Sequence, residues 1–440
     1  MRHPKSRRNL AFFGALYPYL GGKRRLCPLI FREIDRVIPR RLWGGLTLLD
    51  AFSGGGAVSL YAKALGFRVV AADIAERARV IGEGLVANSR VRLTREDILR
   101  LLAPRTGAPG RVESGYAPAA FTAEQACLLD SAMEAAERTP DPAKAALYRL
   151  LAIRVAMLAH PLSQVRPGTI ERVTSGGWES VSEKCVKQYV DGPRLLRPEK
   201  LWALAQRINA GVFEGQGRFV KGDIFDLLPT VQTNVAYFDP PYANTRSYEA
   251  EYKTLDAILG DSARPVSAFS RKDGAGLVDE ILKRAAHIPI WVLSFGNAAV
   301  DLQDLEAKMK TLGRETRATA VRYAHKASIA SAEKIETNRE FVVVGWDPTS
   351  TLVRDAVRIG DVGNDALVPL HADPHLVSPE GTATLGLLSD RLEQGEATRA
   401  KERASKGRGI AAPNESRVDD PDAVLREAGV DGDGEGRLER

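Results

Sequence analysis

The chain has 440 residues, 44% of them hydrophobic and 27% charged, which is enough for two or three ordinary globular domains. The net charge of +6 and the pI of about 9.1 favour a polyanionic partner, although a merely basic surface fits these numbers as well. Three scattered cysteines exclude a disulfide framework, and the scattered histidines predict no metal site. No stretch approaches the ~20 apolar residues of a membrane span, so we expect a cytoplasmic protein that does not associate with membranes.

The first regular elements are two apolar runs that each end on an acid. Residues 46–50, LTLLD, predict a buried strand, and SGGG with the helical run AVSLYAKALGF follow it. RVVAAD then predicts a second buried strand that ends on Asp73. Strand, glycine turn, helix and strand together predict a βαβ unit of a parallel sheet.

The next part of the chain has helical spacing instead. Residues 122–137, 142–160 and 197–208 predict three helices, the last opened by a proline. A polar, glycine-containing stretch at 167–185 separates the second helix from the third. We therefore predict that residues 75–215 form a mainly helical insertion with an exposed loop.

Four further apolar runs predict strands that return to the sheet: GRFVKGDIFDLL, VAYFDPPY, IPIWVLSFGN and EFVVVGW. Such alternation predicts an open, doubly wound Rossmann-like α/β sheet, with residues 1–74 and 216–347 as its two parts. No aromatic residue follows Trp346, so we expect residues 348–440 to be a largely disordered tail. Part of the run TLVRDAVRIGDVGNDALVPL is expected to pack on the core.

The glycines and acids at the strand ends suggest a nucleoside-bearing cofactor. Glycines between a strand and a helix let backbone approach a ligand closely, and Asp73 suits ribose hydroxyls. Asp223 can meet the amine of an adenine, with Ile224 or Phe225 against the ring. A tight turn with acidic helix caps explains the same residues, and the strand ends alone leave both interpretations open.

DPPY, at residues 239–242, predicts a site for a planar amine. Pro240 and Pro241 have fixed φ and no N–H, so the carbonyls around them stay free as acceptors. Asp239 adds a carboxylate and Tyr242 a flat ring. Acceptors held in place around an exocyclic amine favour a pyramidal nitrogen whose lone pair can attack an electrophilic methyl group. An extended X-Pro-Pro turn is the plain structural alternative.

Two basic stretches complete the candidates. Lys23, after Gly21 and Gly22, can approach a carboxylate or phosphate, or can simply belong to a basic turn. The polar loop carries Trp178 and Lys184, which suit bases and phosphates, although Trp178 can equally anchor the loop.

In this order the motifs resemble the D12 class of DNA adenine-N6 methyltransferases, the Dam-like enzymes. YLGGK at 19–23, AFSGGGAV at 51–58, DI at 73–74 and DPPY match the family's ordered motifs, with VLSFGN and NREFVVVGW as its later strands. The resemblance covers about residues 15–346. VTSGGWESVS stands where enzymes that methylate GATC carry another motif, so the recognition sequence stays open.

The resemblance implies an S-adenosyl-L-methionine-dependent enzyme that methylates a flipped-out adenine in double-stranded DNA. Asp239, Pro240, Pro241 and Tyr242 would be catalytic. The implied cofactor-binding residues are Tyr19, Gly22, Lys23, Phe52, Gly54, Asp73, Asp223 and Ile224. The expected DNA-binding residues are Thr174, Trp178, Lys184 and Arg246.

Several alternatives remain at this point. The same fold can act on cytosine N4, an RNA adenine or a protein glutamine, although Asp239 favours adenine over the Ser and Asn of those relatives. A non-catalytic DNA-binding relative is a second class, against which the intact Asp239 and glycine loop argue. We expect a monomer without a metal, and the sequence leaves open whether a restriction endonuclease partner exists.

Overall fold

The computed structural model describes residues 11–117, 120–159, 196–241, 251–261, 268–270, 276–296, 301–322 and 339–362. All of them belong to the compact unit of residues 1–387, and the second unit, 388–440, lies outside the described residues. Within the described ranges, no helix is both long and apolar enough to cross a bilayer.

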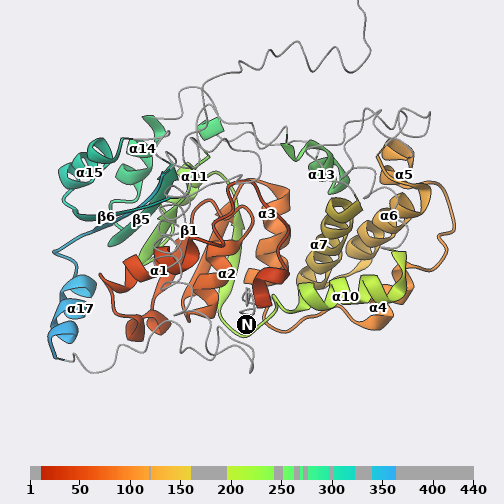
Figure 1. Ribbon diagram of the computed structural model, residues 1–440, viewed down its shortest axis with the longest axis horizontal. Coiled ribbons are helices and arrows are strands. Elements are labelled where there is room, and N and C mark those ends of the chain that lie inside the picture. The colour runs from red at the N-terminus through yellow and green to blue at the C-terminus, as the bar shows by residue number, and fades with distance from the viewer. Residues whose placement is uncertain are drawn as a thin grey trace, which may run out of the picture. The chain divides into compact units, whose positions relative to one another are not determined.

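A seven-stranded sheet forms the centre of the described part (Figure 1), with strand order β3-β2-β1-β4-β5-β7-β6. The strands are β1 (Thr47–Asp50), β2 (Arg68–Asp73), β3 (Gly217–Lys221), β4 (Val235–Phe238), β5 (Ile290–Gly296), β6 (Glu315–Arg322) and β7 (Arg339–Trp346). The first five are parallel to one another, whereas β7 runs antiparallel to both β5 and β6. The predicted doubly wound, Rossmann-like α/β fold is therefore confirmed.

Successive residues of the strands face opposite sides of the sheet, as strand geometry requires. Leu48 and Val69 belong to one hydrophobic cluster, while Leu49 and Val70 belong to the other. All four are at least 96% buried, which explains why these strands are apolar throughout and do not alternate with polar residues.

Helices cover both faces (Figure 1). The first cluster receives residues from α1 (Cys27–Asp35), α2 (Ala57–Ala64), α3 (Glu76–Ile81), α4 (Arg95–Leu101), α5 (Arg111–Tyr116), α6 (Ala123–Arg138), α7 (Pro142–Ala159), α10 (Pro198–Asn209), α13 (Lys253–Ile258) and α17 (Thr351–Val362). The second cluster receives residues from α11 (Ile224–Leu227), α14 (Leu277–Arg284) and α15 (Leu302–Thr311). Short 3₁₀ or π turns are η1 (Ala11–Gly14), η2 (Arg40–Gly45), η3 (Gly82–Val86) and η6 (Ala268–Ser270).

Local sequence signals determine where the predicted helices begin and end. Thr122 and Gln125 form a capping box at the start of α6, and Pro198 occupies the first turn of α10. Gly66, directly after α2, has φ of +95°, a conformation that glycine adopts without steric cost. The three helices predicted at 122–137, 142–160 and 197–208 are therefore present, as α6, α7 and α10.

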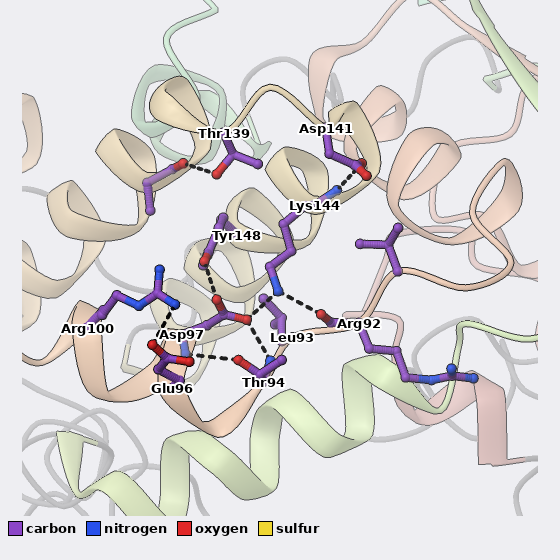
Figure 2. Close-up of polar contacts among 12 residues, drawn as sticks. Arg92, Leu93, Thr94, Glu96, Asp97, Arg100, Thr139, Asp141, Lys144 and Tyr148 are labelled. Atoms are coloured by element: carbon purple, nitrogen blue, oxygen red, sulfur yellow. Dashed lines mark hydrogen bonds and ion pairs between the residues drawn. The ribbon is translucent and has the colours of Figure 1, made fainter.

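A buried carboxylate joins α4 to α7 (Figure 2). Asp97 accepts hydrogen bonds from the Thr94 backbone N–H at 2.6 Å and from the Tyr148 hydroxyl at 2.7 Å, and it forms an ion pair with Lys144. Lys144 also donates to the carbonyl of Arg92 at 2.7 Å. The network attaches the loop before α4 to the helical layer.

The start of the tail packs on the core as expected, because Val353 and Ala356 of α17 are buried. The rest of the predicted tail, after residue 362, lies outside the described residues. The boundaries that we predict at residues 74 and 215 are not tested and stay predictions.

Candidate active site

The candidate site lies where the sheet changes its winding direction. From β1 the chain moves outward through β2 to β3, then returns to form β4 on the other side of β1. Ligands of doubly wound sheets bind at such a point, beyond the carboxyl ends of the strands. Asp50, Asp73 and Asp239 end β1 and β2 or directly follow β4, so all three acids reach this edge.

A pocket of about 1050 Å³, its open mouth included, occupies this edge. Its residues come from the segment before α1, the glycine turn, the end of β2, the turn before α11, the DPPY motif and η6. They are Tyr19, Leu20, Gly21, Gly22, Lys23, Arg24, Asp50, Ala51, Phe52, Ser53, Gly54, Gly55, Ala57, Val58, Asp73, Ile74, Ala75, Arg77, Gly222, Asp223, Ile224, Phe225, Tyr237, Asp239, Pro241, Ala268 and Phe269. Its place beyond the carboxyl ends of the strands is where doubly wound folds bind nucleoside-bearing cofactors.

One wall of the pocket is aromatic. Phe52 packs edge-on against Phe269 at 5.3 Å between centroids, and Phe225 stacks on Phe269 at 5.6 Å. Ile224 lies beside them and is 5% exposed. These apolar faces provide a surface against which a flat heterocycle can pack.

The glycine turn is shaped by two left-handed residues and by a tyrosine. Gly54 and Gly56 have φ of +44° and +70°, and Gly56 precedes the first turn of α2. A Cβ on Gly55 would lie 2.7 Å from Cβ of Tyr19, so only glycine leaves room for this side chain. The turn and the YLGGK segment thus form one surface of the pocket.

Asp73 has a structural role in the same turn. Its Oδ2 accepts the Gly54 N–H at 2.8 Å and its Oδ1 accepts the Ala75 N–H at 2.9 Å. Burial raises the pKa of Asp73, and the two backbone hydrogen bonds oppose that shift. Each carboxylate oxygen keeps a second lone pair, so the turn role and a ligand role are compatible.

Asp223 likewise has two roles in the structure, as a helix cap and as part of the pocket wall. It caps α11, accepting the Phe225 N–H at 3.0 Å, and it also lines the pocket. The capping interpretation is therefore correct for this residue, and its place in the pocket wall leaves the cofactor role as a prediction.

Lys23 connects the first motif to DPPY and to β7. Its Nζ lies 2.7 Å from Oδ1 of Asp239 and 3.3 Å from Oε1 of Glu340, and only 4% of its side chain is exposed. Ser294 donates to Asp239 at 3.3 Å, and Tyr237 shares a 2.6 Å hydrogen bond with Ser294. Burial raises the pKa of Asp239, the Lys23 ammonium lowers it, and the charge of Glu340 raises it.

The sequence segments that form this pocket are similar to those of known proteins. The family model of the D12 class N6 adenine-specific DNA methyltransferases matches residues 19–105, which include the YLGGK segment, the glycine turn and Asp73. This part of the chain is similar to the D12 class. The family resemblance seen in the sequence is thus confirmed.

A known enzyme is also similar to the chain. The Type II methyltransferase M2.HphI of Haemophilus parahaemolyticus is 23% identical over 343 residues, which are 74% of this chain and 96% of the relative. The similarity therefore extends well beyond the D12 match and covers nearly all of that enzyme.

All eight cofactor-binding residues predicted from the D12 motifs line the pocket. They are Tyr19, Gly22, Lys23, Phe52, Gly54, Asp73, Asp223 and Ile224. Asp239 and Pro241 line it as well, whereas Pro240 does not. Four predicted DNA-binding residues, Thr174, Trp178, Lys184 and Arg246, lie outside the described residues, as does Tyr242.

The sequence did not single out Asp50 and Arg77, two pocket residues within the segment that the D12 family model matches. Asp50 accepts a hydrogen bond from the Ser59 hydroxyl at 2.6 Å, and its Oδ1 has no partner in the described part of the chain. The pKa of Asp50 is raised to about 7, mainly by burial. The charges of Asp239 and Asp73 also raise this pKa, whereas the Ser59 hydrogen bond lowers it. The sequence signal that could have identified Asp50 is that the first strand, like the second, ends on an acid.

Arg77 could not have been found in this way. It is the second residue of α3, is 6% exposed and pairs with Asp256 of α13 at 2.7 Å. Nothing in the local sequence distinguishes it from Arg79, the other arginine of ERARVI.

Proposed function

We propose that this chain is a DNA methyltransferase that uses S-adenosyl-L-methionine to methylate N6 of a flipped-out adenine in double-stranded DNA. The observation that carries the proposal is the place of Asp239. This carboxylate lies in the wall of the pocket at the carboxyl ends of the strands and pairs with Lys23, in a chain whose first motifs match the D12 class. Aspartate at this position favours adenine, because the cytosine-N4 enzymes carry serine more often.

The residues of the pocket fit the proposed cofactor. The aromatic wall of Phe52, Phe225 and Phe269 suits an adenine ring, and Asp73 and Asp223 offer acceptors for its hydroxyl and amino groups. The unpartnered Oδ1 of buried Asp50 suits a cationic group such as an ammonium. When bound, S-adenosylmethionine supplies an electrophilic methyl group.

The chain's own residues act on the amine that receives this methyl group. The Asp239 carboxylate and the carbonyls beside the prolines accept the N–H bonds of the base, which aligns the lone pair of its nitrogen. Lys23 favours the ionised, accepting form of Asp239. Tyr242 would stack on the flipped base, and no covalent bond to the enzyme is needed.

DNA is the proposed substrate, and residues 75–215 with Thr174, Trp178, Lys184 and Arg246 are the proposed readers of its sequence. The relative M2.HphI is a Type II methyltransferase, which supports a role in a restriction-modification system. A restriction endonuclease would be the functional partner of such a system. A cytoplasmic monomer fits this role.

The test is to incubate the protein with DNA and methyl-labelled S-adenosylmethionine, then digest the DNA to nucleosides. We expect label in N6-methyldeoxyadenosine. Label in N4-methylcytosine, or in RNA or protein only, would replace the proposed acceptor by one of the alternatives.

The variant Asp239→Ala separates an enzyme from a non-catalytic DNA-binding relative. We expect it to lose methylation while it retains DNA binding. Equal DNA binding without any methylation by the wild type would support the non-catalytic relative.

A further inference from the structure

Three side chains that are far apart in the sequence stack beside the pocket. The ring of Tyr19 lies 5.1 Å from that of Tyr252 with an angle of 17° between them. The guanidinium of Arg77 lies 4.7 Å from the centroid of the Tyr252 ring. Tyr252 is 4% exposed, so this cation–π contact is shielded from water.

An ion pair holds this stack in place. Nη1 of Arg77 donates to Oδ2 of Asp256 at 2.7 Å, and the two side chains are only 7% and 3% exposed. The charge of Arg77 also acts on Tyr19: burial raises the pKa of the Tyr19 hydroxyl to about 12, and the guanidinium opposes that shift. Arg77 thus contacts Asp256 through Nη1 and Tyr252 through its planar group, which a lysine ammonium cannot do with the same geometry.

A second hydrogen bond runs directly between the YLGGK segment and the residue before α13. The hydroxyl of Tyr252 accepts the backbone N–H of Leu20 at 2.8 Å. Tyr19 and Arg77 line the pocket, whereas Tyr252 and Asp256 are not part of its wall. Residues 251–258 therefore reach the pocket through Tyr19 and Arg77.

The Tyr252 contact involves residues that follow DPPY closely in the chain. Pro241 lies in the pocket wall at the end of the described DPPY residues, and the next described segment begins at residue 251. Residues 251–258 thus follow DPPY closely in the chain, and Tyr252 connects them to the pocket wall.

We propose that Arg77 is a positioning residue that couples the cofactor pocket to the segment following DPPY. A ligand that fills the pocket fixes Tyr19 and Arg77, and through Asp256 and Tyr252 it fixes residues 251–258, which follow DPPY in the chain. This inference rests on the proposed function, because it assigns the two sides of the contact to cofactor and base.

The test compares Arg77→Ala with Arg79→Ala. Arg79 lies on the same helix and pairs with Glu76 and Glu83, but it does not line the pocket. Two quantities are measured: the Kd for S-adenosylhomocysteine by calorimetry, and amide hydrogen exchange of residues 251–261 with and without that ligand. Asp256→Asn serves where Arg77→Ala does not fold, since it keeps the side-chain volume and removes the charge.

We expect Arg77→Ala to weaken binding at least about tenfold and to speed exchange of 251–261 even without ligand. Arg79→Ala should change the Kd less than about twofold. Wild-type protein should show slower exchange of 251–261 when the ligand is added. The double variant Arg77→Ala/Asp256→Ala should bind no more weakly than Arg77→Ala, because both changes remove one contact.

Unchanged exchange of 251–261 in unliganded Arg77→Ala would show that Arg77 does not hold these residues in place. Equal affinity of Arg77→Ala and wild type would overturn the coupling. If wild-type protein binds no S-adenosylhomocysteine, the proposed function and the coupling are both wrong. Exchange in the unliganded proteins then still shows whether Arg77 holds residues 251–261 in place.

Discussion

Nζ of Lys23 lies 2.7 Å from Oδ1 of Asp239, so the first motif of the chain and the DPPY motif meet in a buried ion pair. The lysine is also 3.3 Å from Glu340 of β7. One cation therefore pairs with two carboxylates, and the three side chains come from three different parts of the sequence. Its removal should change the chemistry of Asp239 before it changes anything else at the site.

Lys23→Met should move the acid limb of the pH–activity profile to higher pH. Burial raises the pKa of Asp239 and Lys23 lowers it, so without the lysine the carboxylate is protonated at a higher pH and accepts no N–H bond there. We expect a shift of about one pH unit or more in kcat, measured at saturating cofactor from about pH 5.5 to about 9.

Lys221→Met is the matched control. Lys221 pairs with Glu76 at 2.9 Å, and 41% of its side chain is exposed. Its removal should leave the profile where it is. An acid limb at the same pH in Lys23→Met and wild type would contradict the role given to the ion pair.

Asp50→Asn should stabilise the ligand-free protein above neutral pH. Burial raises the pKa of Asp50 to about 7, so the folded state binds this proton more tightly than the unfolded chain does. The resulting stabilisation is complete below the ordinary aspartate pKa of about 3.9 and is lost as the pH rises through about 7. The variant lacks this loss, and we expect it to gain up to about 4 kcal/mol relative to wild type at about pH 8.

Urea unfolding at about pH 5 and about pH 8 measures this difference. Asp226→Asn, which changes an exposed carboxylate on α11, should show the pH dependence of the wild type. The prediction fails if wild type and Asp50→Asn lose the same free energy of unfolding between the two pH values.

Gly55→Ala should weaken cofactor binding without a change of charge or polarity. The added Cβ would lie 2.7 Å from Cβ and 2.9 Å from Cγ of Tyr19, atoms too close to the backbone to move aside cheaply. Tyr19 lines the pocket, so its displacement should raise the Kd for S-adenosylhomocysteine about tenfold, or about 1.4 kcal/mol.

Gly45→Ala provides the comparison, because a Cβ there meets nothing within 4 Å. We expect it to bind the ligand as the wild type does in the same calorimetric titration. Wild-type affinity in Gly55→Ala would show that the pocket tolerates movement of Tyr19.

Asp97→Ala should destabilise the helical layer. It removes the acceptor of the Thr94 N–H and the Tyr148 hydroxyl and leaves the Lys144 ammonium without its carboxylate (Figure 2). We expect a loss of about 2 to 4 kcal/mol in the free energy of unfolding, measured in urea.

Glu96→Ala changes the neighbouring acid of the same helix. Glu96 pairs only with Arg100 among the described contacts, and the two side chains are 76% and 65% exposed. Its loss should cost no more than about 0.5 kcal/mol. Equal effects of the two variants would remove the buried network as a source of stability.

Most strands could be predicted because burial leaves a strong local signal. β1, β2, β4, β5 and β7 are covered on both faces, so their sequences are continuous apolar runs that end at an acid or a glycine. β6, ETRATAVR, was not predicted. It pairs only with β7 at the edge of the sheet, and its residues alternate between exposed and half-buried, so no apolar run marks it.

The sequence by itself determined the D12 motifs and the acids at the strand ends, because parallel strands deliver their carboxyl ends to one edge whatever lies between them. Only the tertiary structure decided which charges meet there. Lys23 with Asp239 and Glu340, and Arg77 with Asp256, are pairs whose members lie on separate segments. Their identity depends on packing between elements distant in the chain, and that packing leaves no periodicity or local motif in the sequence.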